Sequence, residues 1–494
     1  MRVMLANPPA YMDDPKRHFI QSGSRWSFSL FIPKHVKEHY QPYPFGLGYA
    51  TSLLKQDPTN EVVGLDACAM DLDASEFIQS VSAFSPDILL VDVPTVSFPP
   101  TMKLLSEIKT RIGCKIVLAG GHVTALANDV LMEYPYIDYC MLGEYEQSFR
   151  DFVRFEQQNG KGTVLVDSIA YRREAQVITN RSNAHNSTLA DLDQLPYPDR
   201  DDFKVQWYHD FEVAGKPCVQ MLTSRGCPYK CSFCMPIRVM YGDTSYYSKR
   251  HPTSIVDEMV AVSEKYGARQ VYFDDDTFAV DRQRLRLFCD EIRKRGLDLP
   301  WAGMGDITLD QETLKQMSTA GCVGLKFGVE SANATTLNAI RKHFVNAQRT
   351  KTFAEWCKKL GIWTHATYII GLPGETREDI LRTIKFAKSL DTDSVQFSIA
   401  TPFPGTPFYM QAKENGWLTT TDWTMYDGGN FSVLNYPQLS TGEIEELHKT
   451  ALKKWYTSVL LRELLHPRRI RKIIAAGSLA YATRKITSHL AGRL

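Results

Sequence analysis

The chain has 494 residues, of which 44% are hydrophobic and 23% charged, and its net charge is +1. This length predicts two or three domains, and the composition is ordinary for a soluble globular protein. The balanced charge argues against a chain whose main task is to bind nucleic acid or anionic lipid. The sequence contains no run of about 18 apolar residues, so we expect no membrane span.

The first part of the chain alternates short apolar strands with helices. The expected strands are 3–6, 61–66, 87–92, 115–119 and 139–142, and the expected helices are 46–54, 72–84, 98–112 and 123–133. Continuously apolar strands joined by helical crossovers predict an α/β fold with a parallel, doubly wound, Rossmann-like sheet. We assign residues 1–155 to this domain. The opening stretch, interrupted early by Pro and Asp, does not predict a signal peptide.

Residues 10–43 form an unusually long connection, rich in aromatic and basic side chains such as His18, Phe19 and Phe31. Long connections are more often functional than accidental, and open α/β sheets bind ligands at the carboxyl ends of their strands. We therefore expect this segment to lie over that edge. Packing against the next domain is an equally good interpretation.

Residues 156–215 change character. Two short strands, 162–167 and 176–179, predict a small hairpin. A polar tract at 180–187 and the turn-rich segment Leu195–Arg200 then predict a linker.

From residue 216 to residue 408 the alternation of strands and helices returns. The expected strands are 218–223, 270–274, 302–305, 324–328, 363–370 and 394–399, and the expected helices are 253–266, 281–296, 310–319, 334–341, 347–360 and 376–389. Six such units predict a partial (β/α)6 barrel of the TIM type, with its chemistry at the carboxyl ends of the strands. Residues 409–494 are expected to be a helical C-terminal region, with helices near 441–464 and 467–490.

Three cysteines, Cys227, Cys231 and Cys234, follow the first strand of this barrel with the spacing C-x3-C-x2-C. A structural zinc site normally closes with a fourth Cys or His. Three thiolates on one short loop instead suit a [4Fe–4S] cluster that keeps one iron open for a small ligand. A zinc site, in a redox-sensing or regulatory protein without turnover, is the alternative. Ten cysteines without a regular framework fit reduced thiols in a cytoplasm.

This loop resembles the signature of the radical S-adenosylmethionine (radical SAM) superfamily, C-x3-C-x-aromatic-C, with Phe233 at the aromatic position. The resemblance implies that the open iron binds the amino and carboxylate groups of SAM. It also implies that an electron, from a reductant such as flavodoxin or ferredoxin, splits SAM and releases a 5′-deoxyadenosyl radical.

Four further segments, each at the end of a barrel strand, resemble SAM-contacting motifs of the same superfamily. They are 271–278, 328–331, 368–375 and 400–407, although the third has Thr367 or Tyr368 where the family pattern begins with Gly. The resemblance implies that SAM is bound by Phe233, Asp275, Asp276, Glu330, Ser331, Gly371, Glu375 and Thr401. Helix capping by Asp276 or Asp281, and a simple helix start at Glu330, are the structural alternatives.

The order of the domains resembles that of radical SAM proteins with an N-terminal cobalamin-binding domain. The matching segments are 7–9, 94–97, 120–122 and 142–144. The resemblance implies that cobalamin is bound by Asn7, Pro8, Thr95, Ser97, Gly120, Gly121, His122, Gly143 and Glu144. The D-x-H-x-x-G motif, which supplies a cobalt-binding histidine in classical cobalamin domains, is absent, because 66–71 contains no histidine. The alternative for His122 is a surface residue at a helix start.

The resemblance as a whole is to the class B methyltransferases and anaerobic oxidative cyclases. It implies SAM cleavage followed by methylation of an unactivated carbon of a small-molecule, lipid or natural-product substrate. The alternative keeps the cofactors but closes, rearranges or oxidises a ring. A methylthiotransferase would use further cysteines, but Cys68, Cys114 and Cys140 stand in apolar contexts that predict core residues. No acid, base or second hydrogen donor is assigned.

The C-terminal segment 468–490 is basic and predicts an amphipathic helix. Such a helix can contact a membrane surface, which would suit a lipid-like substrate, or dock on the barrel with its basic face in water.

Overall fold

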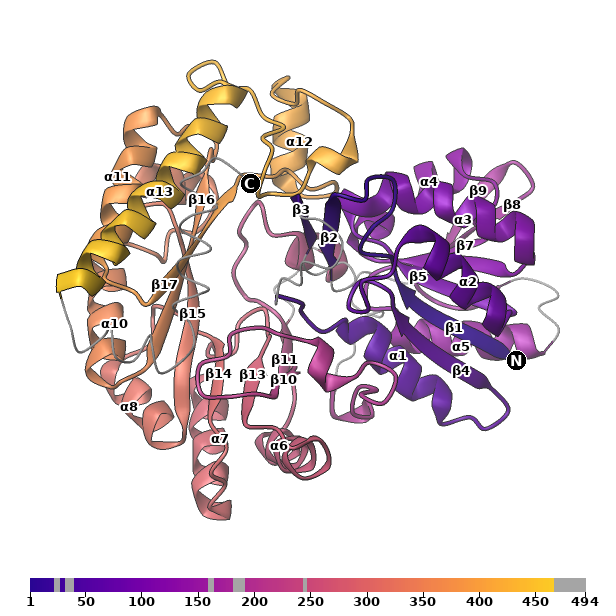
Figure 1. Ribbon diagram of the computed structural model, residues 1–494, viewed down its shortest axis with the longest axis horizontal. Coiled ribbons are helices and arrows are strands. Elements are labelled where there is room, and N and C mark those ends of the chain that lie inside the picture. Colours follow the sequence, from indigo (N-terminus) through magenta and orange to yellow (C-terminus); the bar gives the residue numbers. More distant parts are fainter. Residues whose placement is uncertain (22–26, 32–39, 159–163, 181–191, 243–246, 466–494) are drawn as a thin grey trace.

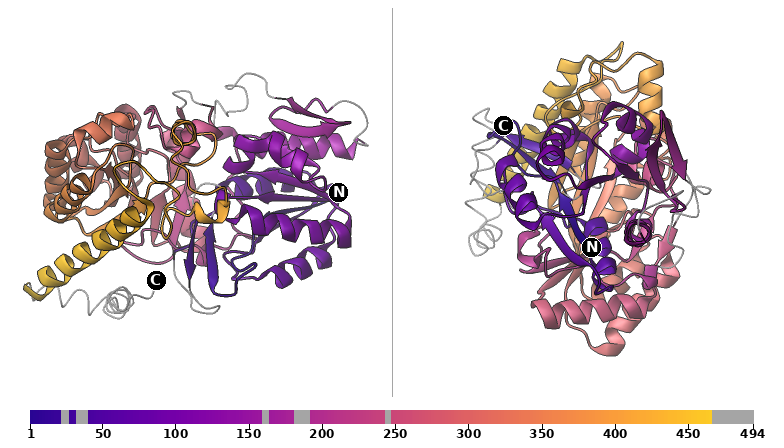
Figure 2. Two further views of the ribbon diagram at one scale, coloured as in Figure 1. Left: turned by 90° about the horizontal axis from the view of Figure 1, so that it is seen from above. Right: turned by 90° about the vertical axis from the view of Figure 1, so that its right-hand side faces the viewer.

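The computed structural model describes residues 1–21, 27–31, 40–158, 164–180, 192–242 and 247–465. Two halves lie side by side, each built around its own sheet, as Figures 1 and 2 show.

The N-terminal sheet has seven strands in the order β4-β1-β5-β6-β7-β8-β9. Their bounds are β1 Arg2–Asn7, β4 Glu61–Asp66, β5 Ile88–Asp92, β6 Lys115–Ala119, β7 Tyr139–Met141, β8 Ile169–Arg173 and β9 Gln176–Asn180. The first five in space are parallel, and β8 and β9 are antiparallel. The predicted doubly wound sheet is therefore confirmed.

Five helices cover this sheet: α1 Phe45–Lys55, α2 Ala74–Phe84, α3 Phe98–Ile112, α4 Gly121–Glu133 and α5 Glu146–Gln157. Along β1 the side chains alternate between two apolar clusters. Val3 and Leu5 pack with α1 and α5, whereas Met4 and Ala6 pack with α2, α3 and α4. Because both faces are covered, the strand is apolar at every position from Val3 to Ala6.

Two expectations for this half need correction. The hairpin predicted near 162–179 forms, but its first strand is Ile169–Arg173 instead of 162–167, and the hairpin extends the main sheet. The segment 10–43 contains a hairpin as well, made of β2 Arg17–Gln21 and β3 Ser27–Phe31.

The second half holds a six-stranded parallel sheet in the order β10-β13-β14-β15-β16-β17. Its strands are β10 Cys218–Met221, β13 Gln270–Phe273, β14 Trp301–Met304, β15 Cys322–Glu330, β16 Trp363–Ile370 and β17 Ser394–Ile399. The helices are α6 Pro252–Tyr266, α7 Arg282–Arg295, α8 Gln311–Thr319, α9 Ala334–Ala339, α10 Ala347–Lys359 and α11 Arg377–Ser389. The partial barrel of six units is confirmed, with β10 and β17 as its edges.

The remaining elements are short apart from α13. They are the strand pair β11 Ser224–Gly226 and β12 Tyr247–Lys249, the single turns η1 Thr95–Ser97, η2 Leu192–Gln194, η3 Val205–Trp207, η4 Pro236–Met240 and η5 Trp423–Met425, and the helices α12 Pro407–Glu414 and α13 Thr441–Leu465. The predicted helix at 441–464 is thus confirmed. Between α12 and α13, residues 415–440 are irregular apart from η5. The segment 468–490 lies outside the described residues.

The β2–β3 hairpin joins the two halves. Ser29 Oγ donates to Asp427 Oδ2 at 2.8 Å, and Asn430 Nδ2 donates to the Ser29 carbonyl at 2.7 Å. Two interpretations were open for 10–43, a position over the carboxyl edge of the N-terminal sheet and packing against the next domain. These contacts agree with the second, and the bonds from Asn7 and Ser97 to Gln21 agree with the first.

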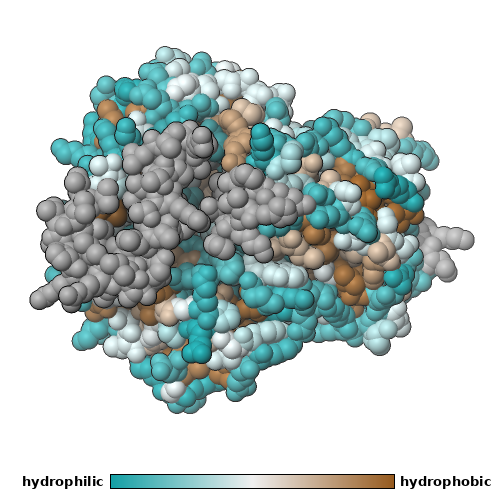
Figure 3. Space-filling model, viewed as in Figure 1, coloured by the Kyte–Doolittle hydropathy of each residue, from teal (hydrophilic) through white to brown (hydrophobic). Residues whose placement is uncertain are grey.

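No helix of the described residues is long and apolar enough to cross a membrane. On the face in Figure 3, hydrophobic residues are interspersed with hydrophilic ones.

Candidate active site

The cysteine loop begins where β11 ends, at the carboxyl end of the barrel strands. All ten cysteines lie within the described residues; seven are buried, and only Cys227, Cys231 and Cys234 are partly exposed. The buried group includes Cys68, Cys114 and Cys140, as expected for core residues. The loop thiols are therefore the ones that an incoming iron–sulfur cluster can reach, and their soft sulfur donors fit it.

Burial raises the pKa of each of the three loop thiols above the ordinary value of a cysteine. Burial raises the pKa of Cys227 to about 12, and the ammonium of Lys342 opposes this shift. Because thiolates are the iron ligands, cluster binding must release the thiol protons. Among the described residues, no group of three or more His, Cys, Asp and Glu side chains is placed to hold a single metal ion.

Several strand ends hold the loop in place. Asp276 Oδ2 accepts from the backbone N–H of Gly226 at 2.8 Å, directly before the first cysteine, and from the Tyr241 hydroxyl at 3.2 Å. Within the loop, the backbone N–H of Ser232 donates to the Ile340 carbonyl at 3.0 Å. Asp276 thus lies beside the cysteines, and its predicted contact with SAM stays a prediction.

Asp275 has other partners. Its carboxylate is buried and accepts from the backbone N–H of Thr223 at 2.7 Å and from the Ser224 hydroxyl at 2.6 Å. These bonds fasten the end of β10 to the end of β13. Asp275 faces these protein donors, so its predicted contact with SAM also stays a prediction.

Glu330 ends β15 in the left-handed region, with φ of 61°, and forms a buried ion pair with Lys342. A Cβ on Gly328 would lie 2.3 Å from Glu330 Oε1 and 2.5 Å from Lys342 Nζ, so the pair occupies the space that this glycine leaves. The ammonium lies near Cys231 as well. Lys342 was not predicted, because nothing in the local sequence shows that it turns back toward the cysteines.

Ser331, Gly371 and Glu375 form one hydrogen-bonded group. Glu375 accepts from the Ser331 hydroxyl at 2.9 Å and from the backbone N–H groups of Gly371 and Leu372 at 3.1 and 3.0 Å. Burial raises the pKa of Glu375 to about 7. Three predicted SAM residues are thus brought together, with the carboxylate bracing the turn after β16.

The last two predicted SAM residues lie apart from that group. Thr401 is buried and its hydroxyl donates to the Ile399 carbonyl at 3.1 Å, and Phe233 packs against the barrel core while partly exposed.

All nine residues predicted to bind cobalamin lie at the carboxyl edge of the N-terminal sheet, and all nine are buried. Asn7 Nδ2 donates to Asp66 Oδ1 and to the Gln21 carbonyl, both at 2.9 Å, and Ser97 Oγ donates to Gln21 Oε1 at 2.7 Å. Gln21 belongs to β2, so the hairpin covers this edge.

The glycines and the histidine at the start of α4 are covered too. A Cβ on Gly121 would lie 2.3 Å from Met235 Sδ of the cysteine loop. His122 contacts Phe98, with ring centroids 4.2 Å apart, and Trp423, at 5.1 Å. Burial lowers the pKa of His122 to about 3, so the ring is neutral. The surface position considered for His122 is therefore wrong. A corrinoid can reach this edge only if the covering side chains move.

Glu144 forms an ion pair with the cysteine loop. Arg225, two residues before Cys227, donates to Glu144 Oε1 at 2.6 Å and to Glu146 Oε1 at 2.7 Å, and all three side chains are buried. This ion triad joins the start of α5 to the approach of the cysteine loop. Arg225 was not singled out from the sequence, since its partners stand about 80 residues away.

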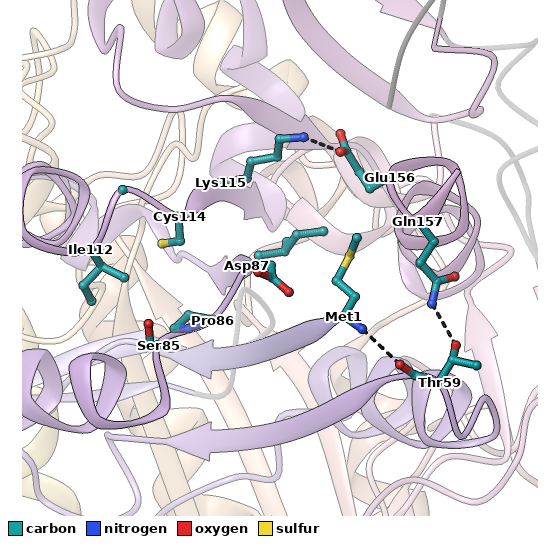
Figure 4. A pocket seen from close by; sticks show the side chains of 12 residues that line it. Met1, Thr59, Ser85, Pro86, Asp87, Ile112, Cys114, Lys115, Glu156 and Gln157 are labelled. Atoms are coloured by element: carbon teal, nitrogen blue, oxygen red, sulfur yellow. Dashed lines mark hydrogen bonds and ion pairs between the residues drawn. The ribbon is translucent and has the colours of Figure 1, made fainter. Parts of the chain in front are cut away.

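A cavity of about 930 Å³ opens at the other end of the N-terminal sheet. Figure 4 shows its lining, where Lys115 pairs with Glu156 and the Met1 ammonium donates to the Thr59 carbonyl. It lies at the amino ends of β1, β5 and β6, away from every predicted site residue.

Comparisons with known proteins agree with this arrangement. The model of the radical SAM superfamily matches residues 221–387, and that of the B12 binding domain matches residues 37–153. An uncharacterised methyltransferase of Pyrococcus horikoshii is 30% identical over 427 residues, which cover 85% of this chain and 88% of the relative. The anaerobic magnesium-protoporphyrin IX monomethyl ester cyclase of Cereibacter sphaeroides is 26% identical over 414 residues, covering 81% of this chain and 65% of that protein.

Among solved structures, the radical SAM methyltransferase TsrM of Kitasatospora setae, with cobalamin and a [4Fe–4S] cluster bound, shares the fold. Its TM-score is 0.65 at 17% identity, with 90% of this chain and 84% of TsrM covered. Together with the three partly exposed thiols and the two sheets, these matches show that the chain belongs to the cobalamin-dependent radical SAM enzymes, whose cofactors are a [4Fe–4S] cluster, SAM and cobalamin.

Proposed function

We propose that this enzyme transfers a methyl group from SAM to an unactivated carbon of a small molecule. The observation that carries the proposal is the placement of the three partly exposed thiols, the only ones that are not buried, at the carboxyl end of the barrel. The relative that matches 85% of the chain at 30% identity is named a methyltransferase, which favours methyl transfer over other outcomes.

When bound, the cluster supplies the electron that cleaves SAM, and cobalamin carries the methyl group. For the chain itself, we propose that Cys227, Cys231 and Cys234 hold the cluster. We also propose that Asp276, Glu330 and the other motif residues contact SAM. In the same way, we propose that the predicted residues of the sheet edge contact cobalamin. The three loop cysteines are supported by exposure and donor chemistry.

The second candidate is ring closure or ring oxidation with the same cofactors. Three of the relatives, at 26–27% identity, are anaerobic cyclases of magnesium-protoporphyrin IX monomethyl ester. Relatives of both kinds match the chain over both of its halves.

Product analysis separates the two candidates. Anaerobically reconstituted protein is incubated with SAM, a strong reductant and an extract of the host organism. Methyl transfer yields S-adenosylhomocysteine together with 5′-deoxyadenosine, whereas ring closure or oxidation yields 5′-deoxyadenosine alone. Protein that binds about four irons and consumes no SAM under these conditions contradicts both.

The remaining partners are part of the proposal. A low-potential protein such as flavodoxin or ferredoxin would deliver the electron, and a cytoplasmic location is supported by ten unpaired cysteines. We retain the domain bounds 1–155, 156–215, 216–408 and 409–494. Peripheral membrane contact through 468–490 would concern residues outside those described.

A further inference from the structure

The inner face of β15, β16 and β17 is the face turned away from helices α8, α10, α11 and α13. Several polar side chains stand on it, and we call five of them the polar wall. They are Lys326, His365, Thr367, Gln396 and Ser398. Figure 1 shows the three strands side by side.

Burial alternates along these strands. The neighbours that point outward, such as Phe327, Ala366 and Phe397, are buried in the barrel core. On the inner face Gln396 is exposed, and the other four members of the polar wall are partly exposed. The inner face of β16 also carries Trp363 and Ile369, so the polar side chains stand between apolar ones. Because the core needs only the outward face, folding does not explain the polar side chains of the inner face.

The register of the strands places the polar wall in rows. Lys326 is opposite His365, which is opposite Ser394, and in the next row Thr367 is opposite Gln396. Neighbouring strands lie about 4.8 Å apart, so a small molecule lying across the strands would touch several of these groups at once. Along β17, Gln396 Nε2 donates to Ser398 Oγ at 2.9 Å.

The inner face of the first three strands is closed. Gln220 Oε1 accepts from the backbone N–H of Tyr43 at 2.7 Å, and Gln270 Oε1 accepts from the backbone N–H of Val213 at 2.8 Å. Phe211 fills the lower end of the barrel, with its ring centroid 5.6 Å from that of Tyr272 and 6.2 Å from that of His365, so it also covers the row of Lys326 and His365. A ligand inside the barrel therefore meets the upper part of the polar wall, at Thr367, Gln396 and Ser398.

The polar wall also lies close to the cysteine loop. Gly328 stands opposite Thr367 in the register, and the Glu330–Lys342 pair fills the space beside Gly328. That ammonium in turn lies near Cys231. A molecule held on the polar wall is thus within the same end of the barrel as the thiols.

The charges of the polar wall are compensated. Lys326 forms an ion pair with Asp210, and its ammonium lies 4.5 Å from the Tyr272 ring centroid. His365 Nδ1 is hydrogen-bonded to Ser394 Oγ at 2.6 Å beside the Phe211 ring, and Gln396, Thr367 and Ser398 carry no charge. The groups left to recognise a ligand are therefore neutral donors and acceptors of hydrogen bonds.

We propose that the polar wall binds the substrate, and that this substrate is a water-soluble molecule with hydroxyl or amide groups near its reacting carbon. A hydrocarbon or lipid chain would displace water from Gln396, Thr367 and Ser398 without replacing the hydrogen bonds, which is unfavourable. The inference rests on the proposed methyl transfer and narrows its substrate class.

The test uses SAM with a trideuterated methyl group. Reconstituted protein, reductant and labelled SAM are added to the aqueous fraction and, separately, to the chloroform-soluble fraction of a host strain that lacks this gene. We expect at least about tenfold more deuterated methyl in the aqueous products by mass spectrometry. Label mainly in the chloroform fraction overturns the inference but leaves methyl transfer standing. Label in neither fraction contradicts methyl transfer, and the inference falls with it.

Near-isosteric substitutions test the residues. In Gln396→Leu and Thr367→Val, labelling of the aqueous product should fall at least about tenfold, mainly through a higher KM for the substrate and with the KM for SAM unchanged, because each loses its hydrogen bond to the substrate. Gln348→Leu, on the exposed side of α10, is the matched control and should label like wild type. Iron content and the thermal midpoint show whether each variant folds. Folded Gln396→Leu and Thr367→Val proteins with unchanged labelling overturn the role of the polar wall.

Discussion

The three loop cysteines differ from the other seven in exposure, and iron content should follow this difference. Replacing Cys227, Cys231 or Cys234 by Ala leaves two thiolates, which cannot hold the cluster firmly. We expect iron to fall from about four per chain to near background in each variant, with loss of 5′-deoxyadenosine formation.

The control for these variants is Cys114→Ala, since Cys114 is buried in the core of the N-terminal half. Its iron content, measured after anaerobic reconstitution, should equal that of wild type. A loop variant that keeps its iron and still cleaves SAM contradicts the ligand assignment.

Glu375 should make stability depend on pH. Its folded pKa is about 7, above the ordinary value of 4.5, because burial disfavours the charged carboxylate. The folded state therefore binds the proton more tightly than the unfolded state. The bound proton therefore stabilises the folded state fully below about pH 4.5. As the pH rises through 7 this contribution to the free energy of unfolding, up to about 3 kcal/mol, is lost.

Glu375→Gln removes this titration while its amide still bonds the turn after β16. Between pH 4.5 and pH 7.5 the urea midpoint of the variant should therefore rise relative to that of wild type. Comparing the two proteins at each pH cancels other groups that titrate in this range, such as Asp66, whose pKa burial raises to about 6. A difference that stays constant across this range contradicts a buried, titrating Glu375.

At the scale of elements, the loop after β17 packs on α4 through Gly405. This glycine has φ of 80°, and a Cβ there would lie 2.9 Å from Ala125 Cβ and 3.0 Å from Val239 Cγ2. Gly405→Ala should therefore lower the free energy of unfolding in two ways. The left-handed backbone costs about 1–2 kcal/mol with a Cβ present, and steric overlap of the Cβ costs about 1–3 kcal/mol.

Gly296 supplies the matched control for this contact. It ends α7 with φ of 61°, and nothing lies within 4 Å of a Cβ built there. Gly296→Ala should show the strain alone, so Gly405→Ala should have the lower thermal midpoint. Equal midpoints would mean that the loop and α4 do not press on each other in solution.

The elements that the sequence predicts well are those whose pattern is local. The middle of a strand such as β1, from Val3 to Ala6, is continuously apolar because both faces are buried, and this shows directly in the sequence. The β2–β3 hairpin was missed because Ser29 is bonded to Asp427 and Asn430, about 400 residues away. Arg225 was overlooked for the same reason, since no local pattern contains its two glutamates.

At the scale of the whole molecule, the two halves close on each other at the predicted cobalamin edge. Met235 of the cysteine loop abuts Gly121, Gln21 of the hairpin bonds Asn7 and Ser97, and Trp423 covers His122. These covering residues come from three distant parts of the chain. The motif residues of the edge were predictable from the sequence, but their cover was not.

Cobalamin uptake should therefore be limited by removal of this cover. Trp423 is partly exposed and packs its ring 5.1 Å from His122, so Trp423→Ala lowers the cost of opening the edge. We expect hydroxocobalamin to bind the variant at least about threefold faster than wild type, because a smaller barrier separates the closed and open states. Stopped-flow absorbance of the bound corrinoid measures this rate. Trp207→Ala, a partly exposed tryptophan of the linker, should bind at the wild-type rate. An unchanged or slower rate in Trp423→Ala would show that the corrinoid enters by a route that leaves this contact in place.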